Sequence, residues 1–163
     1  MTTAQGYGMP DKLVPLTTDG KVRLEDELEG LRSQRKAIAE RIHDAQELGT
    51  SQSDAEYDDA KLEQGMVEGR ILEIEDILRR ATVIDSAAAH RSARVVLGSG
   101  VRVEQNGATQ HYEIVGAPEA DAKQGRISNE SPLGRALLGR GVGEEFDVNV
   151  PRGVIKIKVI KID

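Results

Sequence analysis

A heptad pattern in residues 24–45, LEDELEGLRSQRKAIAERIHDA, sets the architecture of the N-terminal half. Its apolar side chains recur in alternating steps of four and three residues, at Leu24, Leu28, Leu31, Ile38, Ile42 and Ala45. Arg35 is the one charged residue in this series. Such spacing is typical of a helix that buries a narrow seam against a partner helix. We predict a helix over residues 18–48, capped by Thr17 or Thr18 at its start and ended by Gly49.

A second heptad follows almost at once and predicts a second helix. Its apolar positions are Tyr57, Ala60, Val67, Ile71, Ile74, Leu78 and Ala81. Ser53 fits the N-cap of a capping box in which Glu56 reaches back to the cap. Because only residues 49–53 separate the two seams, the helices must fold back on each other. We therefore predict an antiparallel coiled-coil arm over residues 16–85, preceded by a flexible segment, residues 1–15.

Two features of this arm are open to more than one interpretation. Gly65 and Gly69 lie inside the second helix, where each is less favourable than alanine by about 1 kcal/mol. They mark either a close approach between helices or a tolerated weakness. The arm itself is either a probe that presents its tip, residues 49–53, far from its base, or a dimerisation arm.

Strand patterns replace the heptads after residue 85. Residues 86–92 lack an apolar period and predict a linker. Asn106 and Gly107 predict a hairpin turn because both tolerate positive φ. A short helix is predicted from Ser131 to Gly139, and strands are predicted at residues 95–97, 101–103, 110–115, 145–150 and 154–162. The fold class is therefore α+β: the coiled-coil hairpin and a small globular domain over residues 93–163.

The composition excludes several kinds of site. The 163 residues include no cysteine, and the three histidines (His43, His90 and His111) are isolated, so thiolate chemistry and Cys or His metal centres are excluded. Aromatic residues make up 2% of the chain, which leaves little for stacking on bases or flat cofactors. Neither a nucleotide-binding glycine motif nor the spacing of a catalytic triad is present. We expect no catalytic residues, metal or cofactor of its own.

Charge and hydropathy indicate which kinds of partner the chain can bind. The net charge is −6, with about −8 in residues 1–85 and about +2 in residues 86–163. An acidic chain is repelled by bare phosphate backbones, so we expect contact with nucleic acid only through another protein. No apolar run approaches the ~20 residues of a membrane span, and the N-terminus lacks the apolar stretch of a secretory signal. We expect a cytoplasmic monomer that does not bind membranes.

Several short motifs follow one another in a characteristic order. They are residues 16–20 (LTTDG), 49–57 (GTSQSDAEY), 64–65 (QG), 68–71 (EGRI), 81–85 (ATVID), 131–137 (SPLGRAL) and the turn 151–153. Together they resemble the bacterial Gre family of transcription elongation and transcript-cleavage factors. The resemblance implies a C-terminal domain with an FKBP-like fold, without prolyl isomerase activity, and bacterial RNA polymerase as the partner. It also implies that this domain docks at the rim of the polymerase secondary channel while the arm reaches towards the active centre.

The arm tip departs from the family pattern. Family members usually read Gly-Asp-Leu-Ser-Glu-Asn-Ala-Glu-Tyr where residues 49–57 read GTSQSDAEY. The resemblance implies that the two tip acids help to hold a catalytic Mg²⁺ of the polymerase, and these positions are Thr50 and Ser53 here. A neutral hydroxyl is a poor substitute for a carboxylate on this cation. We therefore expect a polymerase-binding regulator with weak or no stimulation of transcript cleavage.

Two other functions remain open. In one, Asp54 contacts the Mg²⁺ of the polymerase and acts with Glu56 as a shifted acidic pair, so that the protein is an active transcript-cleavage factor. In the other, the chain is a coiled-coil adaptor unrelated to RNA polymerase. The candidate tip residues are Thr50, Ser51, Gln52, Ser53, Asp54 and Glu56. The candidate docking residues are Glu130, Ser131 and Pro132, by resemblance, and Arg135 beside them.

Overall fold

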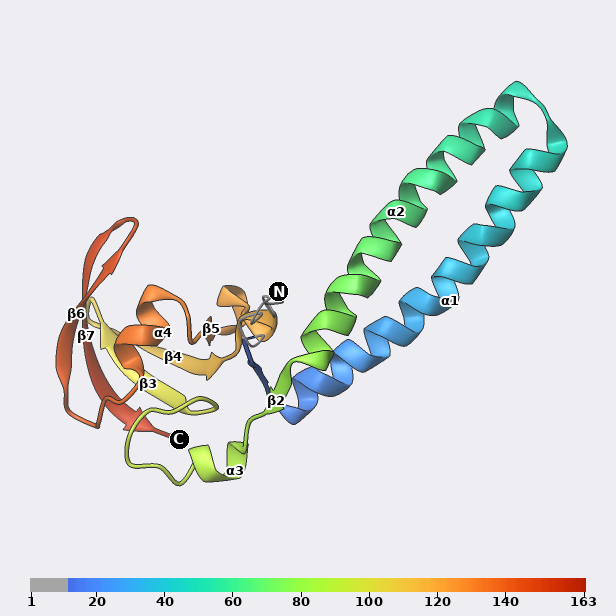
Figure 1. The fold of residues 1–163 in the computed structure, drawn as a ribbon. Helices are drawn as coiled ribbons and strands as arrows, with labels where there is room; N and C mark the ends of the chain where they lie inside the picture. Colours follow the sequence, from blue (N-terminus) through green and yellow to red (C-terminus); the bar gives the residue numbers. More distant parts are fainter. Residues whose placement is uncertain (1–11) are drawn as a thin grey trace, which may run out of the picture.

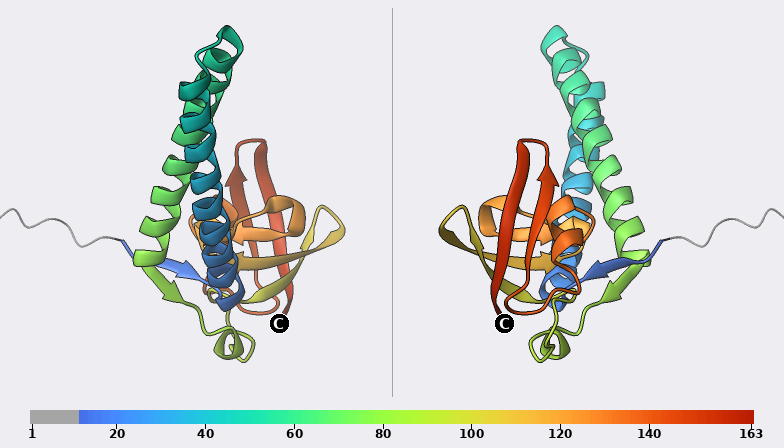
Figure 2. Two further views of the ribbon diagram at one scale, coloured as in Figure 1. Left: turned by 90° about the vertical axis from the view of Figure 1, so that its right-hand side faces the viewer. Right: turned by 90° about the vertical axis from the view of Figure 1, so that its left-hand side faces the viewer.

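The computed structural model describes residues 12–163, which form a long helical arm attached to a small globular domain (Figure 1). The arm is a hairpin of helices α1 (Thr18–Leu48) and α2 (Ser51–Arg79). Figure 2 shows from two opposite sides that the outer part of this hairpin extends well beyond the globular domain. The predicted fold class, an antiparallel coiled-coil hairpin with an FKBP-like α+β domain, is confirmed.

The two arm helices are connected more tightly than predicted. Helix α1 begins as expected, since the Thr17 side chain accepts a hydrogen bond from the Gly20 N–H at 3.0 Å. It ends at Gly49, whose φ of 60° lies in the left-handed region that glycine tolerates. Thr50, not Ser53, is the N-cap of α2. The tip is therefore a connection of two residues, and the predicted five-residue loop is wrong.

The seam between the helices is a hydrophobic core of its own. It buries Leu16, Leu24, Leu28, Ile38, Ala60, Val67, Ile71 and Ile74. Arg35 interrupts the heptad but reaches across the seam and donates from Nε and Nη2 to the Glu68 carboxylate at 2.6 and 3.0 Å. No atom lies within 4 Å of the position that a Cβ would take at Gly65 or Gly69. These glycines therefore do not serve close packing between α1 and α2.

Two three-residue strands close the base of the arm. Strand β1 (Val14–Leu16) runs parallel to β2 (Ala81–Val83), with Val14 opposite Ala81. We predicted a flexible segment for residues 1–15; its last two residues instead belong to β1, and residues 1–11 lie outside the described residues. Ala81 was predicted to continue the second heptad, but the chain leaves the helix at Arg80 and enters β2. Such short strands carry no periodic signal.

The segment between arm and sheet is more regular than predicted. Residues 86–92 were predicted to be a linker without an apolar period. Helix α3 (Ser86–Ala89) occupies the first half of this segment, with Asp85 accepting from the Ala88 N–H at 3.0 Å. Residues 95–97 were expected to be a strand and are not one. Val95 is nevertheless buried, and its N–H donates to the Arg140 carbonyl. The apolar run at residues 95–97 therefore includes a buried residue but does not form a strand.

A five-stranded sheet organises the globular domain. Its strands are β3 (Gly100–Gln105), β4 (Ala108–Val115), β5 (Arg126–Ser128), β6 (Glu145–Val150) and β7 (Gly153–Ile162), in the spatial order β5-β4-β3-β7-β6. Strands β4 and β5 run parallel, whereas the other neighbours are antiparallel. Asn106 and Gly107 form the predicted hairpin turn, with φ of 52° and 78°. The sequence patterns did not predict β5 or the 3₁₀ turns η1 (Ala117–Glu119) and η2 (Ala122–Gln124).

The short helix α4 (Pro132–Leu137) covers the sheet and completes a second hydrophobic core. The buried members of this core are Val95, Val101, Val103, Ile114, Leu137, Val148, Ile157 and Val159. Ser131 is the N-cap of α4, as predicted. No helix within residues 12–163 is both long enough and apolar enough to cross a membrane.

Candidate functional site

The arm tip is a capped turn whose two hydroxyl groups are already engaged. Thr50 Oγ1 accepts a hydrogen bond from the Ser53 N–H at 3.1 Å. Ser53 Oγ accepts from the Thr50 N–H at 2.7 Å and donates to the Thr50 carbonyl at 2.6 Å. The predicted capping box of Ser53 and Glu56 is therefore wrong, because Thr50 and Ser53 form the box one turn earlier. Both hydroxyls stabilise the start of α2.

Carboxylates lie just behind this cap. Asp54 is in the first turn of α2, and Glu56 follows two residues later; both are exposed. Neither carboxylate has a hydrogen-bond or ion-pair partner within residues 12–163. Gln52 is also exposed, and Ser51 is the first residue of the helix. The structure thus brings the six candidate tip residues together, but it gathers no cluster of three or more potential metal ligands in the described part of the chain.

Ion pairs between the helices hold the arm in register. Besides Arg35 with Glu68, the pairs are Arg70 with Glu27, Arg41 with Glu63 and Arg32 with Glu75. Arg70 binds Glu27 in a bidentate manner, at 2.6 and 2.9 Å, and lowers the pKa of that carboxyl group. Single exposed pairs contribute little, but bidentate geometry adds directional restraint. These pairs lie along an arm whose tip is about 45 Å from its base, because α1 has 31 residues and each adds about 1.5 Å.

A buried carboxylate joins the base of the arm to the globular domain. Glu119, at the end of η1, has a side chain only 4% exposed. It accepts hydrogen bonds from the Thr17 N–H at 2.7 Å and from the Thr17 hydroxyl, and Arg23 Nη2 lies 3.4 Å away. A negative charge at the N-terminus of α1 also suits the helix dipole. No local sequence pattern predicts Glu119 as a site residue, because its partners Thr17 and Arg23 lie about a hundred residues away.

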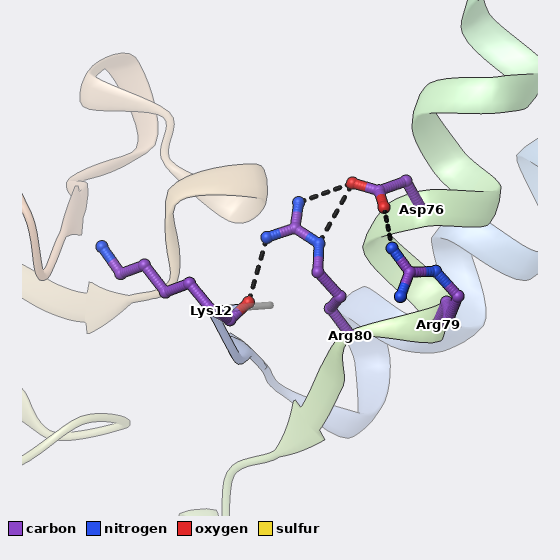
Figure 3. Close-up of polar contacts among 4 residues, drawn as sticks. All are labelled: Lys12, Asp76, Arg79 and Arg80. Carbon is purple, nitrogen blue, oxygen red and sulfur yellow. Dashed lines mark hydrogen bonds and ion pairs between the residues drawn. The ribbon is translucent and has the colours of Figure 1, made fainter. Parts of the chain in front are cut away.

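A second connection runs through the strand segment that precedes α1. Figure 3 shows Arg80 between two partners: its Nη1 donates to the Lys12 carbonyl at 3.0 Å, and its Nε and Nη2 donate to Asp76 at 3.1 and 2.6 Å. Arg79 donates to the other oxygen of Asp76 at 2.6 Å. Hydrogen bonds from Arg80 and Arg79 hold the pKa of the Asp76 carboxyl below its usual value. The Lys12 ammonium pairs in turn with Glu130 of the globular domain.

The four candidate docking residues lie within six consecutive positions of the globular domain, in the loop before α4 and in α4 itself. Ser131 Oγ accepts from the Gly134 N–H at 3.0 Å and donates to the Ser128 carbonyl at 2.7 Å, which fixes the turn that precedes α4. Pro132 and Arg135 are exposed on that helix. Lys12 lowers the pKa of Glu130 by donating a hydrogen bond to it. The structure therefore couples this loop to the base of the arm.

Comparison with known proteins covers both parts of the chain. Residues 14–83 match a family model described as "Transcription elongation factor, N-terminal", and residues 90–163 match "Transcription elongation factor, GreA/GreB, C-term". The transcription elongation factor GreA of Chloroflexus aggregans is 46% identical over 157 residues, which cover 94% of this chain and 99% of that protein. For GreA of Listeria monocytogenes the identity is 44% over 155 residues, covering 93% and 96%.

Among solved structures, the GreA factor homolog 1 (Gfh1) of Thermus thermophilus aligns with 30% identity and a TM-score of 0.45, covering 93% of this chain and 99% of that one. The curated relatives and the two family matches extend over both the arm and the globular domain. The chain belongs to the GreA/GreB family of transcription elongation factors.

Proposed function

We propose that this elongation factor binds bacterial RNA polymerase through its globular domain, extends its arm into the secondary channel, and stimulates transcript cleavage weakly or not at all. Family membership supports this function over that of an adaptor unrelated to transcription. The shape supports the mode of action, because a stiff hairpin carries its tip far from the domain that docks (Figure 1). The protein then acts on the polymerase active centre without catalytic groups of its own.

The observation that carries the proposal is the hydrogen-bonded pair of Thr50 and Ser53 at the tip. Mg²⁺ favours charged oxygen ligands in near-octahedral geometry. Neither position offers a carboxylate, and both hydroxyl groups are bound to backbone atoms of the cap. The Ser53 side chain is also buried, and the Thr50 hydroxyl offers a cation only one neutral oxygen. The arm can therefore occupy the channel while adding little to metal-dependent hydrolysis.

Docking is assigned to the loop that begins α4. Glu130, Ser131 and Pro132 form a turn held by hydrogen bonds, and Arg135 is exposed one turn along the helix. A rigid loop loses little conformational entropy on binding. The exposed Lys12–Glu130 pair places this loop beside the segment that leads into the arm.

Transcript cleavage by a purified, backtracked elongation complex tests the proposal. The wild-type chain, titrated in the presence of Mg²⁺, is expected to shorten the RNA little faster than polymerase alone. The matched variant carries Thr50→Asp and Ser53→Glu, which retain an N-cap and a capping box while adding two carboxylates. We expect this variant to accelerate cleavage. A rapid, magnesium-dependent burst with the wild-type chain would overturn the assignment of weak cleavage.

Asp54 and Glu56 support one alternative, that of an active cleavage factor. Both are exposed near the tip and lack partners within residues 12–163, so both are available to contact the Mg²⁺ of the polymerase. If this alternative holds, the wild-type chain is active in the same assay and Asp54→Ala removes the activity. Displacement of the bound chain by another secondary-channel factor distinguishes both functions from an adaptor role.

A further inference from the structure

Helix α2 exposes apolar side chains on the side that faces away from the seam. Leu62, Met66 and Leu72 are 69%, 70% and 65% exposed. Gly65 and Gly69 lie between them. Because successive helical residues turn by about 100°, these five residues fall within about a third of the helix circumference. We call them the outer face: Leu62, Gly65, Met66, Gly69 and Leu72.

Within residues 12–163 no other element covers the outer face. Large exposed apolar side chains on a surface helix add nothing to the stability of the hairpin, whose seam already has a complete apolar core. The positions above Gly65 and Gly69 are open, so the backbone is uncovered between the flanking side chains. Both glycines weaken the helix relative to alanine. Apolar side chains beside a shallow gap form the kind of surface that accepts a ridge from a partner.

The charge around the outer face restricts the partner. Five of the nine Asp and Glu residues of helix α2 are paired with arginines, and the unpaired acids, which include Asp58 and Asp59, lie in its half near the tip. Asp58 and Asp59 flank the outer face on the side of the tip, and neither has a partner within the described part of the chain. Glu73 lies at the other end, beside Arg70, and Lys61 lies at one edge. Two copies of this face would bring like charges together, whereas a surface bearing Lys or Arg would complement it.

We propose that the outer face is a second contact with RNA polymerase, binding an apolar ridge flanked by basic side chains in the wall of the secondary channel. This inference rests on the proposed function. Residues 62–72 lie about 17–32 Å along the helix axis from the start of α2. Under the proposed function, this part of the arm follows the tip into the channel. The contact supplements docking by the globular domain and holds the arm in place.

Binding of the labelled, full-length chain to purified bacterial RNA polymerase tests the inference. The first variant carries Leu62→Gln and Met66→Gln, which keep good helix formers at exposed positions. We expect its thermal midpoint to stay unchanged and its Kd to rise about tenfold or more. The second variant carries Gly65→Ala and Gly69→Ala, which stabilise the helix but fill the gap. We expect a higher Tm together with weaker binding.

Gly30→Ala is the matched control, since Gly30 is also an exposed helical glycine with open space above it, but on α1. It is expected to raise Tm without altering Kd. If wild-type chain binds polymerase and both outer-face variants bind equally well, the inference is wrong and the proposed function stands. If wild-type chain does not bind polymerase, both are wrong. Self-association of the wild-type chain that the first variant abolishes would assign the face to a second copy and overturn the inference.

Discussion

Replacing Gly20 with alanine tests the connection between arm and globular domain. A Cβ at Gly20 would stand 2.0 Å from Glu119 Oε1 and 2.2 Å from its Cδ. Both separations are far below van der Waals contact, so the buried carboxylate must leave its site. Its departure removes the hydrogen bonds that Thr17 donates from its N–H and hydroxyl. Gly20→Ala should therefore destabilise the protein, although alanine is the better helix former.

The magnitude follows from these contacts. A hydrogen bond to a charged group contributes about 1.5–3 kcal/mol, so losing two costs about 3–6 kcal/mol. Alanine in place of glycine returns up to about 1 kcal/mol, which leaves a net loss of about 2–5 kcal/mol for Gly20→Ala. In a Glu119→Ala background the clash is absent, and the same substitution should stabilise by up to about 1 kcal/mol. The double variant should then be as stable as Gly20→Ala alone.

Guanidinium unfolding followed by circular dichroism measures all four chains of this double-mutant cycle. Gly30→Ala serves as the control for helix propensity, because nothing lies within 4 Å of its Cβ position, and it should stabilise by about 1 kcal/mol in both backgrounds. The reasoning is refuted if Gly20→Ala stabilises the wild-type chain, or if its effect is the same with and without Glu119.

Three further substitutions probe the tip, the seam and the arm base. Thr50→Ala removes the N-cap of α2 and should cost about 0.5–2 kcal/mol in thermal unfolding, while Thr50→Asp should cost far less. Arg35→Ala leaves Glu68 unpaired at the edge of the seam and should lower stability by about 1 kcal/mol, a loss that high salt diminishes. The pKa of Asp76 is lower in the folded protein than in the unfolded chain. This difference stabilises the fold above the unfolded pKa, and the stabilisation is lost as the pH falls through the folded pKa. Asp76→Asn should therefore make stability fall less steeply with pH below about pH 4.

The elements that the sequence predicts best are those whose buried apolar residues recur at a regular spacing. Buried positions such as Leu24, Ile38 and Ile71 repeat along the arm helices, and this spacing alone predicts the hairpin. Asn106 and Gly107 require positive φ, so their order alone predicts the turn. Local patterns of this kind depend on neighbouring residues and are therefore visible in one sequence.

The tip was harder to predict because two caps compete there. Thr50 and Ser53 are both good N-cap residues, and each is followed by residues that suit the first turn of a helix. In the structure Thr50 is the cap and Ser53 completes its box, which adds almost one turn to α2. These residues lie at one end of the arm, and the sequence did not predict the hydrogen bonds among them.

Contacts between distant residues lay beyond any local pattern. Glu119 meets Thr17 across 102 residues, and Lys12 meets Glu130 across 118. Neither pair has a spacing that predicts it, because a charged residue in a loop is usually solvated. The short parallel strands at the base depend on the same long-range proximity. The sequence therefore predicted the two parts of the molecule but not the junction between them.

The closed base has a mechanical consequence. The chain enters the arm through β1 and leaves it through β2, and these strands are hydrogen-bonded to each other. The two helices are therefore joined at both ends, by the turn at the tip and by the strand pair at the base, and share one core between these ends. For a rod about 45 Å long, a rotation of only 5° displaces the tip by about 4 Å, more than the length of a metal–ligand bond. The position of the tip thus depends on the contacts that fix the orientation of the arm at its base.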